Sequence, residues 1–311
     1  MKVQRLLLAT FAVGLAASLA ACTGSSGNPY SPPGGSHTFK HMYISSNNTS
    51  GLIYVYNLPV TSSSTPSATV TVGANPRELF VDSSGRLFVP LNGVTTVRVY
   101  NLPLTATSTP AFNLTTSQAA PESVAQDAAG NIYVADINPV GYIDIYDGPV
   151  NGAASPSTTI SNNGVGASGL EYPYGIAIAP NGDLYASDSS DVNQFTPPFT
   201  ASSVPSASAV PNDDNYGLRI DSNNRVFVAN ASGDGHVSVY TQPFTNSSLP
   251  AFNLNVSASA ILGLAFDGSG NLWVVVAGGA VWEINSPITS SSTATQILTG
   301  ISSGYGIVFG P

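Results

Sequence analysis

The chain of 311 residues carries 17 Asp and Glu against eight Lys and Arg, a net charge of −9, and only 8% of its residues are charged. So few cations cannot neutralise a phosphate backbone, which argues against nucleic acid as a partner. The 30 Gly and 23 Pro are typical of many tight turns between short strands. Composition therefore favours short strands over long solvated helices.

Residues 1–21 have the pattern of an export signal. Lys2 and Arg5 place positive charge at its start, and the apolar run that follows is too short for a transmembrane helix. Small residues end this run immediately before Cys22. We expect residues 1–21 to be removed, which leaves six cations against 17 acids and a net charge of −11 on the mature protein.

Cys22 ends a Leu-Ala-Ala-Cys motif that resembles the lipobox of bacterial lipoproteins. The resemblance implies cleavage before Cys22 and a lipid on its sulfur, and two or more acyl chains anchor a protein stably. Thr23 stands where inner-membrane retention signals have Asp, so the implied location is extracytoplasmic, at the outer membrane or surface of a bacterial cell. Residues 22–37, rich in Gly, Ser and Pro, are expected to form a flexible tether. As the single cysteine, Cys22 also leaves the protein without an internal disulfide.

A Tyr-Asn-Leu-Pro motif and its variants recur six times after the tether. The shared prolines are Pro59, Pro103, Pro149, Pro198, Pro243 and Pro287. Successive copies are separated by 44 to 49 residues. A period of this length is typical of a β-propeller or a related array.

A second motif precedes the first within the repeat and consists of an apolar strand, a four-residue turn and another strand. Two examples are residues 80–89 and 126–136. Asp at the start of the turn can accept a backbone N–H, and Gly or Asn at its fourth position tolerates positive φ. Together with the Val-Tyr strand and a later Phe-Asn-Leu strand, this hairpin makes four antiparallel strands per repeat, which is one propeller blade.

The sequence therefore predicts one all-β domain, residues 38–311, that folds as a monomeric six-bladed β-propeller. The expected blades are residues 39–73, 74–117, 118–164, 165–212, 213–259 and 260–302. The first blade lacks its innermost strand, and residues 304–310 match the inner strand at 173–179. We expect this C-terminal strand to pair with residues 41–45 and close the ring, which would remove the exposed edges of an open array.

The run Pro-Tyr-Gly-Ile-Ala-Ile-Ala-Pro-Asn-Gly-Asp-Leu-Tyr-Ala-Ser-Asp at 173–188, like Gly-Asn-Ile-Tyr-Val-Ala-Asp at 130–136, resembles the NHL repeat and the related gluconolactonase/regucalcin-type six-bladed propellers. The resemblance extends over residues 39–311 and implies the same fold. The matching residues make turns and sheets, so they say little about activity. The long Ser/Thr/Pro turn between the third and fourth strands departs from the NHL pattern.

The loops that enter the innermost strands of a propeller gather around one mouth of its channel, where ligands usually bind. Alignment of the repeats places six residues there: Arg77, Glu122, Tyr174, Tyr216, Leu262 and Tyr305. Three tyrosine rings beside carboxylates offer flat apolar faces and hydroxyl groups to a saccharide or another polar ligand. The alternative is that a Tyr before a Gly packs between adjacent blades.

The loops that leave the second strands bring Asp136, Asp188 and Asn230 to the same mouth. Their oxygens suit a hard cation such as calcium, or they cap neighbouring backbone N–H groups, as Asp and Asn do in turns generally. His236 lies in the following loop and is expected to be a solvated loop residue. No cofactor is predicted, and calcium is the one metal for which the pattern is suitable.

The resemblance to gluconolactonase-type propellers implies a metal-dependent lactonase or lyase as one possible activity. Those enzymes hold a metal with a Glu, two Asn-type ligands and an Asp, and no such set aligns here. The mature chain also has only three histidines, His37, His41 and His236, too few for a histidine-based site. The sequence therefore favours a non-catalytic binding or scaffold module for a protein or a saccharide. The propeller enzyme is the alternative, and a purely structural envelope protein is the third hypothesis.

Overall fold

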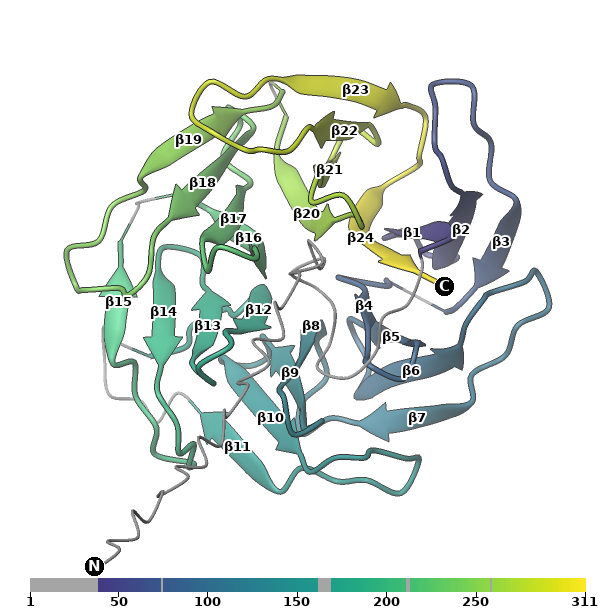
Figure 1. Cartoon of the computed structure of the whole chain (residues 1–311). Helices are drawn as coiled ribbons and strands as arrows, with labels where there is room; N and C mark the ends of the chain where they lie inside the picture. Colours follow the sequence, from purple (N-terminus) through teal and green to yellow (C-terminus); the bar gives the residue numbers. More distant parts are fainter. Residues whose placement is uncertain (1–38, 74, 162–168, 211–212, 258) are drawn as a thin grey trace, which may run out of the picture.

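The computed structural model describes residues 39–311 except 74, 162–168, 211–212 and 258. These residues form 24 strands in six sheets, each of four antiparallel strands. The sheets follow one another around a central axis like the blades of a wheel (Figure 1). The prediction of an all-β six-bladed propeller is confirmed, whereas the predicted signal segment and tether lie outside the described residues.

The strands of each blade are named here from the axis outward. Blade 1 holds β24 (Gly304–Gly310), β1 (His41–Ser46), β2 (Leu52–Asn57) and β3 (Ala68–Thr71); blade 2 holds β4 (Phe80–Val81), β5 (Arg86–Leu91), β6 (Thr96–Asn101) and β7 (Phe112–Thr115); blade 3 holds β8 (Pro121–Gln126), β9 (Ile132–Asp136), β10 (Tyr142–Tyr146) and β11 (Thr158–Ser161). Blade 4 holds β12 (Gly175–Ile178), β13 (Leu184–Ser187), β14 (Val192–Phe195) and β15 (Ala207–Ala209); blade 5 holds β16 (Asn215–Ile220), β17 (Val226–Asn230), β18 (His236–Tyr240) and β19 (Phe252–Asn255); blade 6 holds β20 (Ile261–Phe266), β21 (Leu272–Val276), β22 (Val281–Ile284) and β23 (Ala294–Leu298). Strands β1 to β23 fall within the predicted blade ranges, and β24 is the C-terminal strand predicted to complete blade 1.

The C-terminal strand closes the ring, as predicted. β24 pairs antiparallel with β1, with Gly310 opposite His41 and Ile307 opposite Ile44. The pairing continues past the strand end, since the amide of Lys40 donates to the carbonyl of Gly310 over 2.9 Å. The first blade therefore takes its innermost strand from the other end of the chain, and no innermost edge is left open.

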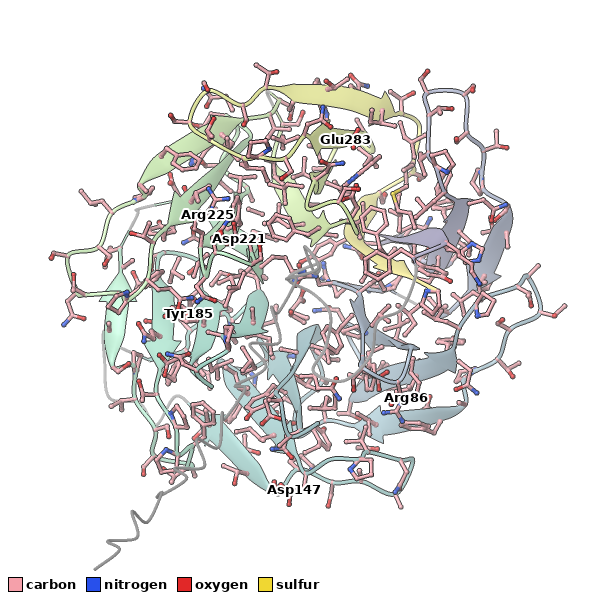
Figure 2. All side chains as sticks on the ribbon, in the orientation of Figure 1. Arg86, Asp147, Tyr185, Asp221, Arg225 and Glu283 are labelled. Carbon is pink, nitrogen blue, oxygen red and sulfur yellow. The ribbon has the colours of Figure 1, made fainter. Side chains whose placement is uncertain are left out.

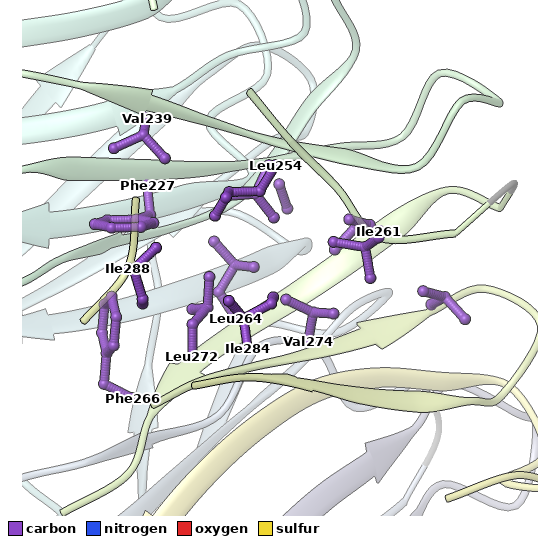
Figure 3. Close-up of a cluster of buried hydrophobic side chains, with 14 residues drawn as sticks. Phe227, Val239, Leu254, Ile261, Leu264, Phe266, Leu272, Val274, Ile284 and Ile288 are labelled. Atoms are coloured by element: carbon purple, nitrogen blue, oxygen red, sulfur yellow. The ribbon is translucent and has the colours of Figure 1, made fainter. Parts of the chain in front are cut away.

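The apolar core is divided among the spaces between blades. In one of these clusters, Phe227 and Leu254 of blade 5 pack against Leu264 and Phe266 of blade 6 (Figure 3). Because the blades are covered on both faces, strands near the axis can be buried along their whole length instead of alternating. An example is β21, Leu-Trp-Val-Val-Val, in which every residue is buried.

The turns between the first and second strands use the predicted chemistry. In blade 2, Asp82 Oδ1 accepts the backbone N–H groups of Ser84 at 3.0 Å and Arg86 at 2.8 Å. The turn in blade 5 repeats this arrangement and ends on Asn224, whose φ is +58°. We call the end of the propeller that carries these turns the turn face, and the opposite end, where the inner strands begin, the mouth face.

The Ser/Thr/Pro turns at the outside of the ring share a second hydrogen-bond pattern. In blade 2 the hydroxyl of Ser108 accepts the backbone N–H of Thr105 at 2.8 Å, and the same Thr-x-x-Ser contact recurs in blades 1, 4, 5 and 6. The peptide bond before each of the six repeat prolines is cis. These turns are exposed and lie far from the channel.

Candidate functional site at the channel mouth

β-Bulges mark the start of four innermost strands. In blade 3 the register slips between Pro121 and Ser123, which leaves Glu122 as the extra residue. Equivalent slips occur in blades 5, 6 and 1. The residues at these slips include Tyr216, Leu262 and Tyr305. A bulge takes a side chain out of the strand's strict alternation, so these residues are free to turn toward the channel mouth.

In blades 5, 6 and 1 the residue after Tyr216, Leu262 or Tyr305 is a glycine, which lets adjacent blades approach closely. A Cβ on Gly263 of blade 6 would lie 2.3 Å from the carbonyl oxygen of Tyr305 in blade 1, and one on Gly306 would lie 2.6 Å from the carbonyl oxygen of Arg77 in blade 2. Gly175 and Gly217 are equally restricted. The inner strands therefore run too close together here for a side chain in four of the six blades.

Arg77 and Glu122 form the polar part of the mouth. Arg77 Nε lies 3.2 Å from Glu122 Oε1, and its guanidinium carbon lies 4.7 Å from the centre of the Tyr305 ring. The Tyr305 hydroxyl donates to Glu122 Oε2 over 3.0 Å, and Asn92 Nδ2 donates to Oε1 over 2.5 Å. Residues from blades 1, 2 and 3 thus meet on one buried carboxylate.

Two further tyrosines extend this group across blades 4 and 5. The rings of Tyr174 and Tyr216 are stacked, with centroids 4.3 Å apart and planes inclined by 6°, and both side chains are half-buried. Tyr216 is 6.3 Å from Tyr305, centroid to centroid. The structure therefore brings together five of the predicted residues, which we call the mouth cluster. It consists of Arg77, Glu122, Tyr174, Tyr216 and Tyr305.

An ion pair that the sequence did not predict crosses the channel beneath the mouth cluster. Arg219 Nη1 of blade 5 lies 2.9 Å from Glu78 Oε1 of blade 2, and their side chains are only 3% and 2% exposed. Ser123 of blade 3 donates to Glu78 Oε2 over 2.8 Å, and Arg219 also donates to the carbonyl of Leu79 over 3.3 Å. In the alignment of the repeats, Glu78 stands at the position that a glycine occupies in blades 1, 4, 5 and 6. This departure from the repeat was the one sequence signal for the ion pair.

Asp136, Asp188 and Asn230 cap backbone groups within their own blades. Asp136 accepts the amide of Ala120 at 3.1 Å, and Asp188 accepts the amide of Tyr172 at 2.8 Å. Asn230 likewise accepts the amide of Ser232 at 2.9 Å. In the described part of the chain no three His, Cys, Asp or Glu side chains form a group that could hold a metal. Calcium at this mouth stays a prediction.

His236 is not the solvated loop residue that the sequence suggested. It is the first residue of β18 and is 5% exposed. Its Nδ1 lies 3.1 Å from Asp234 Oδ1 and its Nε2 lies 3.4 Å from Asp213 Oδ2. The prediction was wrong because Gly235, at φ +51°, returns the chain to the sheet one residue earlier than the Gly-Asp-Gly loop indicates.

Acidic side chains border the mouth cluster on the side of blades 4 and 5. They are Glu171, Asp191, Asp213, Asp214 and Asp234, and all are exposed or half-exposed. Burial raises the pKa of Asp191, and the negative charge of Glu171 adds to that rise. The charges of Glu122 and Asp214 likewise help burial to raise the pKa of Tyr216, although Arg77 opposes them. We call these five acids the acidic border.

Glu122 is expected to make stability depend on pH. Burial raises its pKa from 4.5 to about 7, against the opposing effect of Arg77 and of hydrogen bonds from Tyr305 and Asn92. A carboxyl that binds its proton more tightly in the folded state contributes stability below about pH 4.5, and this contribution is lost as pH rises to about 7. As pH rises over this range, the free energy of unfolding of a Glu122→Gln variant should therefore fall by about 2–3 kcal/mol less than that of the unaltered protein.

Urea unfolding at intervals from about pH 4.5 to 7.5 measures the effect. The matched control is Glu171→Gln, since Glu171 is exposed in the acidic border. It should leave the pH profile of the free energy of unfolding nearly parallel to that of the unaltered protein. A Glu122→Gln variant whose profile also ran parallel would contradict the assignment.

The fold and the bulged mouth define this chain as a six-bladed β-propeller protein. No family model matches the chain, and no curated protein matches it. Similar solved structures include a protein of unknown function from Bacteroides caccae, with a TM-score of 0.64 and 12% identity over 88% of this chain and 99% of that one. A functionally unknown protein from Desulfotomaculum acetoxidans has a TM-score of 0.58 and 11% identity over 87% and 98% of the two chains. The WD40 β-propeller domain of Doa1 has a TM-score of 0.58 and 10% identity over 88% and 90%. At these identities the likeness shows the fold alone.

Proposed function

We propose that this protein is a non-catalytic binding module whose mouth receives a basic segment of a partner protein. The observation that carries the proposal is the stacked pair Tyr174–Tyr216, half-buried and next to the acidic border. Tyr172, 37% exposed, adds a third ring on the blade 4 side. Tyr and Trp are among the residues whose truncation most often costs a protein interface much of its binding energy.

The charges at the mouth favour a cationic partner. A Lys or Arg placed over a tyrosine face gains about 0.5–2 kcal/mol, depending on how far the pair is desolvated. Arg77, the cation of the mouth cluster, is already paired with Glu122 and lies against Tyr305, so it opposes such a partner little. The acidic border and the overall negative charge would also accelerate encounter with a basic segment, in a salt-dependent way.

Two other functions can be compared with this one. A saccharide could stack on the same rings, as the sequence suggested, but it gains nothing from the acidic border beyond hydrogen bonds. A metal-dependent lactonase or lyase, and with it the relation to NHL-type and regucalcin-type propellers, rests on the sequence resemblance. The side chains of the mouth cluster are hydrogen-bonded or stacked, and we derive no catalytic step from them.

We also propose that the propeller is held at the bacterial cell envelope by a lipid on Cys22, outside the cytoplasm. The support is the lipobox-like motif, which lies outside the described residues. None of the described residues belongs to a helix long and apolar enough to cross a membrane. In this arrangement residues 22–37 would connect the anchor to the propeller, and the propeller would act as a monomer.

Replacing Tyr174 and Tyr216 with Ala should weaken capture of a basic peptide by roughly 10-fold or more, because the stacked faces are lost. The probe is a fluorescein-labelled peptide of alternating Lys, Leu, Arg and Gly, titrated by fluorescence anisotropy at low and at high salt. Binding should also weaken as salt rises. The control is Tyr54→Ala, another half-buried tyrosine, located on β2 of blade 1.

Three results would count against the proposal. They are no binding of the peptide by the unaltered protein, equally tight binding by the double variant, and an equal loss of binding in Tyr54→Ala. A neutral oligosaccharide that binds the unaltered protein, but not the double variant, would identify the mouth as a saccharide site instead. Tyr305 is left intact because its buried ring and its bond to Glu122 make it a packing residue as well.

A further inference from the structure

A pocket of about 450 Å³ opens between blades 4 and 5 on the turn face, at the end of the propeller opposite the mouth cluster. In Figure 2, Tyr185 and Arg225, which line it, lie on the adjacent blades 4 and 5, with Asp221 close to Arg225. The lining comes from the β12–β13 turn, the β16–β17 turn and the segment after β18. It consists of Asn181, Asp183, Tyr185, Asn223, Asn224, Arg225, Thr241, Gln242 and Pro243.

Tyr185 is the first reason to regard this pocket as a binding site. The side chain is fully buried, yet its hydroxyl has no hydrogen-bond partner among the described residues. At the same position in blade 3, Tyr133 donates to Asp127 over 3.1 Å, and in blade 6 the indole of Trp273 donates to Asp267 over 3.0 Å. In blade 4 the turn begins with Ala179 instead of Asp, so the acceptor present in the other two blades is missing.

Gln242 supplies a second unsatisfied group in the same pocket. Its Nε2 is buried and bonds to no partner in the part of the chain that the structure describes, and an unmade hydrogen bond of this kind is costly. Asp183 adds an acceptor, since its two bonds from Asn181 and Gln194 both go to Oδ2, at 2.8 and 2.7 Å. The pocket thus combines two donors that need an acceptor with one carboxylate oxygen, Oδ1, that accepts no bond from a described residue.

The charges in the pocket argue against an ionic ligand. The Arg225 guanidinium is committed to Asp221 through contacts of 2.7 and 2.6 Å, and to the carbonyl of Ile288 at 2.8 Å. An anion would meet the carboxylate of Asp183, and a cation, although it could pair with Asp183, would offer no acceptor to the Tyr185 hydroxyl and Gln242 Nε2. Burial and the nearby Asp183 raise the pKa of Tyr185, so its hydroxyl is protonated and able to donate.

From this geometry we infer that the pocket between blades 4 and 5 binds a neutral polyhydroxy compound, a mono- or disaccharide or a polyol. Such a ligand both accepts and donates at neighbouring atoms. It can accept from the Tyr185 hydroxyl and from Gln242 Nε2 while it donates to Asp183 Oδ1 and to the amide oxygens of Asn223 or Asn224. Pro243 and the Tyr185 ring offer apolar surface to its C–H face, and the volume is within the range of small-molecule sites.

The experiment titrates the purified full-length protein with glucose, galactose, mannose, N-acetylglucosamine, maltose, cellobiose and glycerol, by calorimetry and ligand-observed NMR. At least one of these compounds is expected to bind. Tyr185→Phe removes only the unsatisfied hydroxyl and should weaken that binding at least about fivefold without lowering the melting temperature. Gln242→Leu should weaken it as well.

The matched control is Tyr133→Phe, the same change at the same ring position in blade 3, where the hydroxyl is already bonded. It should lower the melting temperature and leave sugar binding unaltered. The inference is overturned if no compound binds, or if Tyr185→Phe binds the sugar as tightly as the unaltered protein. It is also overturned if Tyr174→Ala abolishes the binding, which would place the sugar at the mouth. Failure here leaves the peptide-binding proposal intact, since that depends on other residues.

Discussion

Removal of residues 304–311 is expected to leave a chain with no cooperative unfolding transition and a strong tendency to associate. The deletion takes away β24, whose Tyr305, Ile307, Val308 and Phe309 are all buried. Burial of each such side chain contributes roughly 1.5–3 kcal/mol, and the sum is comparable with the whole stability of a typical domain. The inner edge of β1 would also be left unpaired and open to other chains.

A single substitution tests the same closure without shortening the chain. Gly306→Ala places a Cβ 2.6 Å from the carbonyl oxygen of Arg77 and 2.8 Å from the Cα of Glu78, both backbone atoms of blade 2. The backbones must separate, and we expect a loss of about 1–3 kcal/mol in the free energy of unfolding. The control is Gly233→Ala, since no atom of a described residue lies within 4 Å of that Cβ. It should change stability by less than about 0.5 kcal/mol.

Circular dichroism with thermal and urea unfolding, together with size-exclusion chromatography, measures both changes. A truncated protein that stayed monomeric and melted at the original temperature would disprove closure by the C-terminal strand. Equal effects of Gly306→Ala and Gly233→Ala would show that blades 1 and 2 do not meet as closely as the structure indicates.

The second large effect is expected at the ion pair that crosses the channel. Arg219→Met should lower the free energy of unfolding by about 3–5 kcal/mol, because it leaves the buried Glu78 without a counter-charge. Burial already raises the pKa of Glu78, and Arg219 is the main group that opposes the rise. Ser123 alone would remain as a partner for that carboxylate.

The double variant Arg219→Met with Glu78→Gln distinguishes the effect of the unpaired charge on stability from the effect of altered packing. Because it removes both charges together, it should recover most of the loss, as replacement of buried ion pairs commonly does. Lys40→Met is the control, since the Lys40 side chain is exposed and forms no ion pair with a described residue. Its loss should be about 0.5 kcal/mol or less. Urea unfolding of the four proteins gives the values, and a double variant as unstable as Arg219→Met alone would contradict this account.

Much of the fold could be predicted because its signals are local and repeated. The cis-proline turns recur every 44 to 49 residues, and the hairpin turns of blades 2, 3, 5 and 6 each have a capping Asp and a residue with positive φ, such as Gly130. Closure of the ring by the C-terminal strand could also be predicted, because Gly304–Gly310 matches an inner strand elsewhere in the chain. For the same reason the five members of the mouth cluster could be found by aligning the repeats.

Other features depend on how the blades face one another, and for these a repeat pattern carries no information. Glu78 and Arg219 meet across the channel although they lie 141 positions apart, because glycines elsewhere in the ring let the inner strands approach closely. His236, placed in β18 by the turn at Gly235, contacts two acids from separate loops. Sequence alone thus determined the number, order and closure of the blades, since hydrogen bonding and turn geometry act within a few residues. Only the tertiary structure decided which polar side chains are paired across the ring and which, like the Tyr185 hydroxyl, are left without a partner, since this depends on the distances between blades.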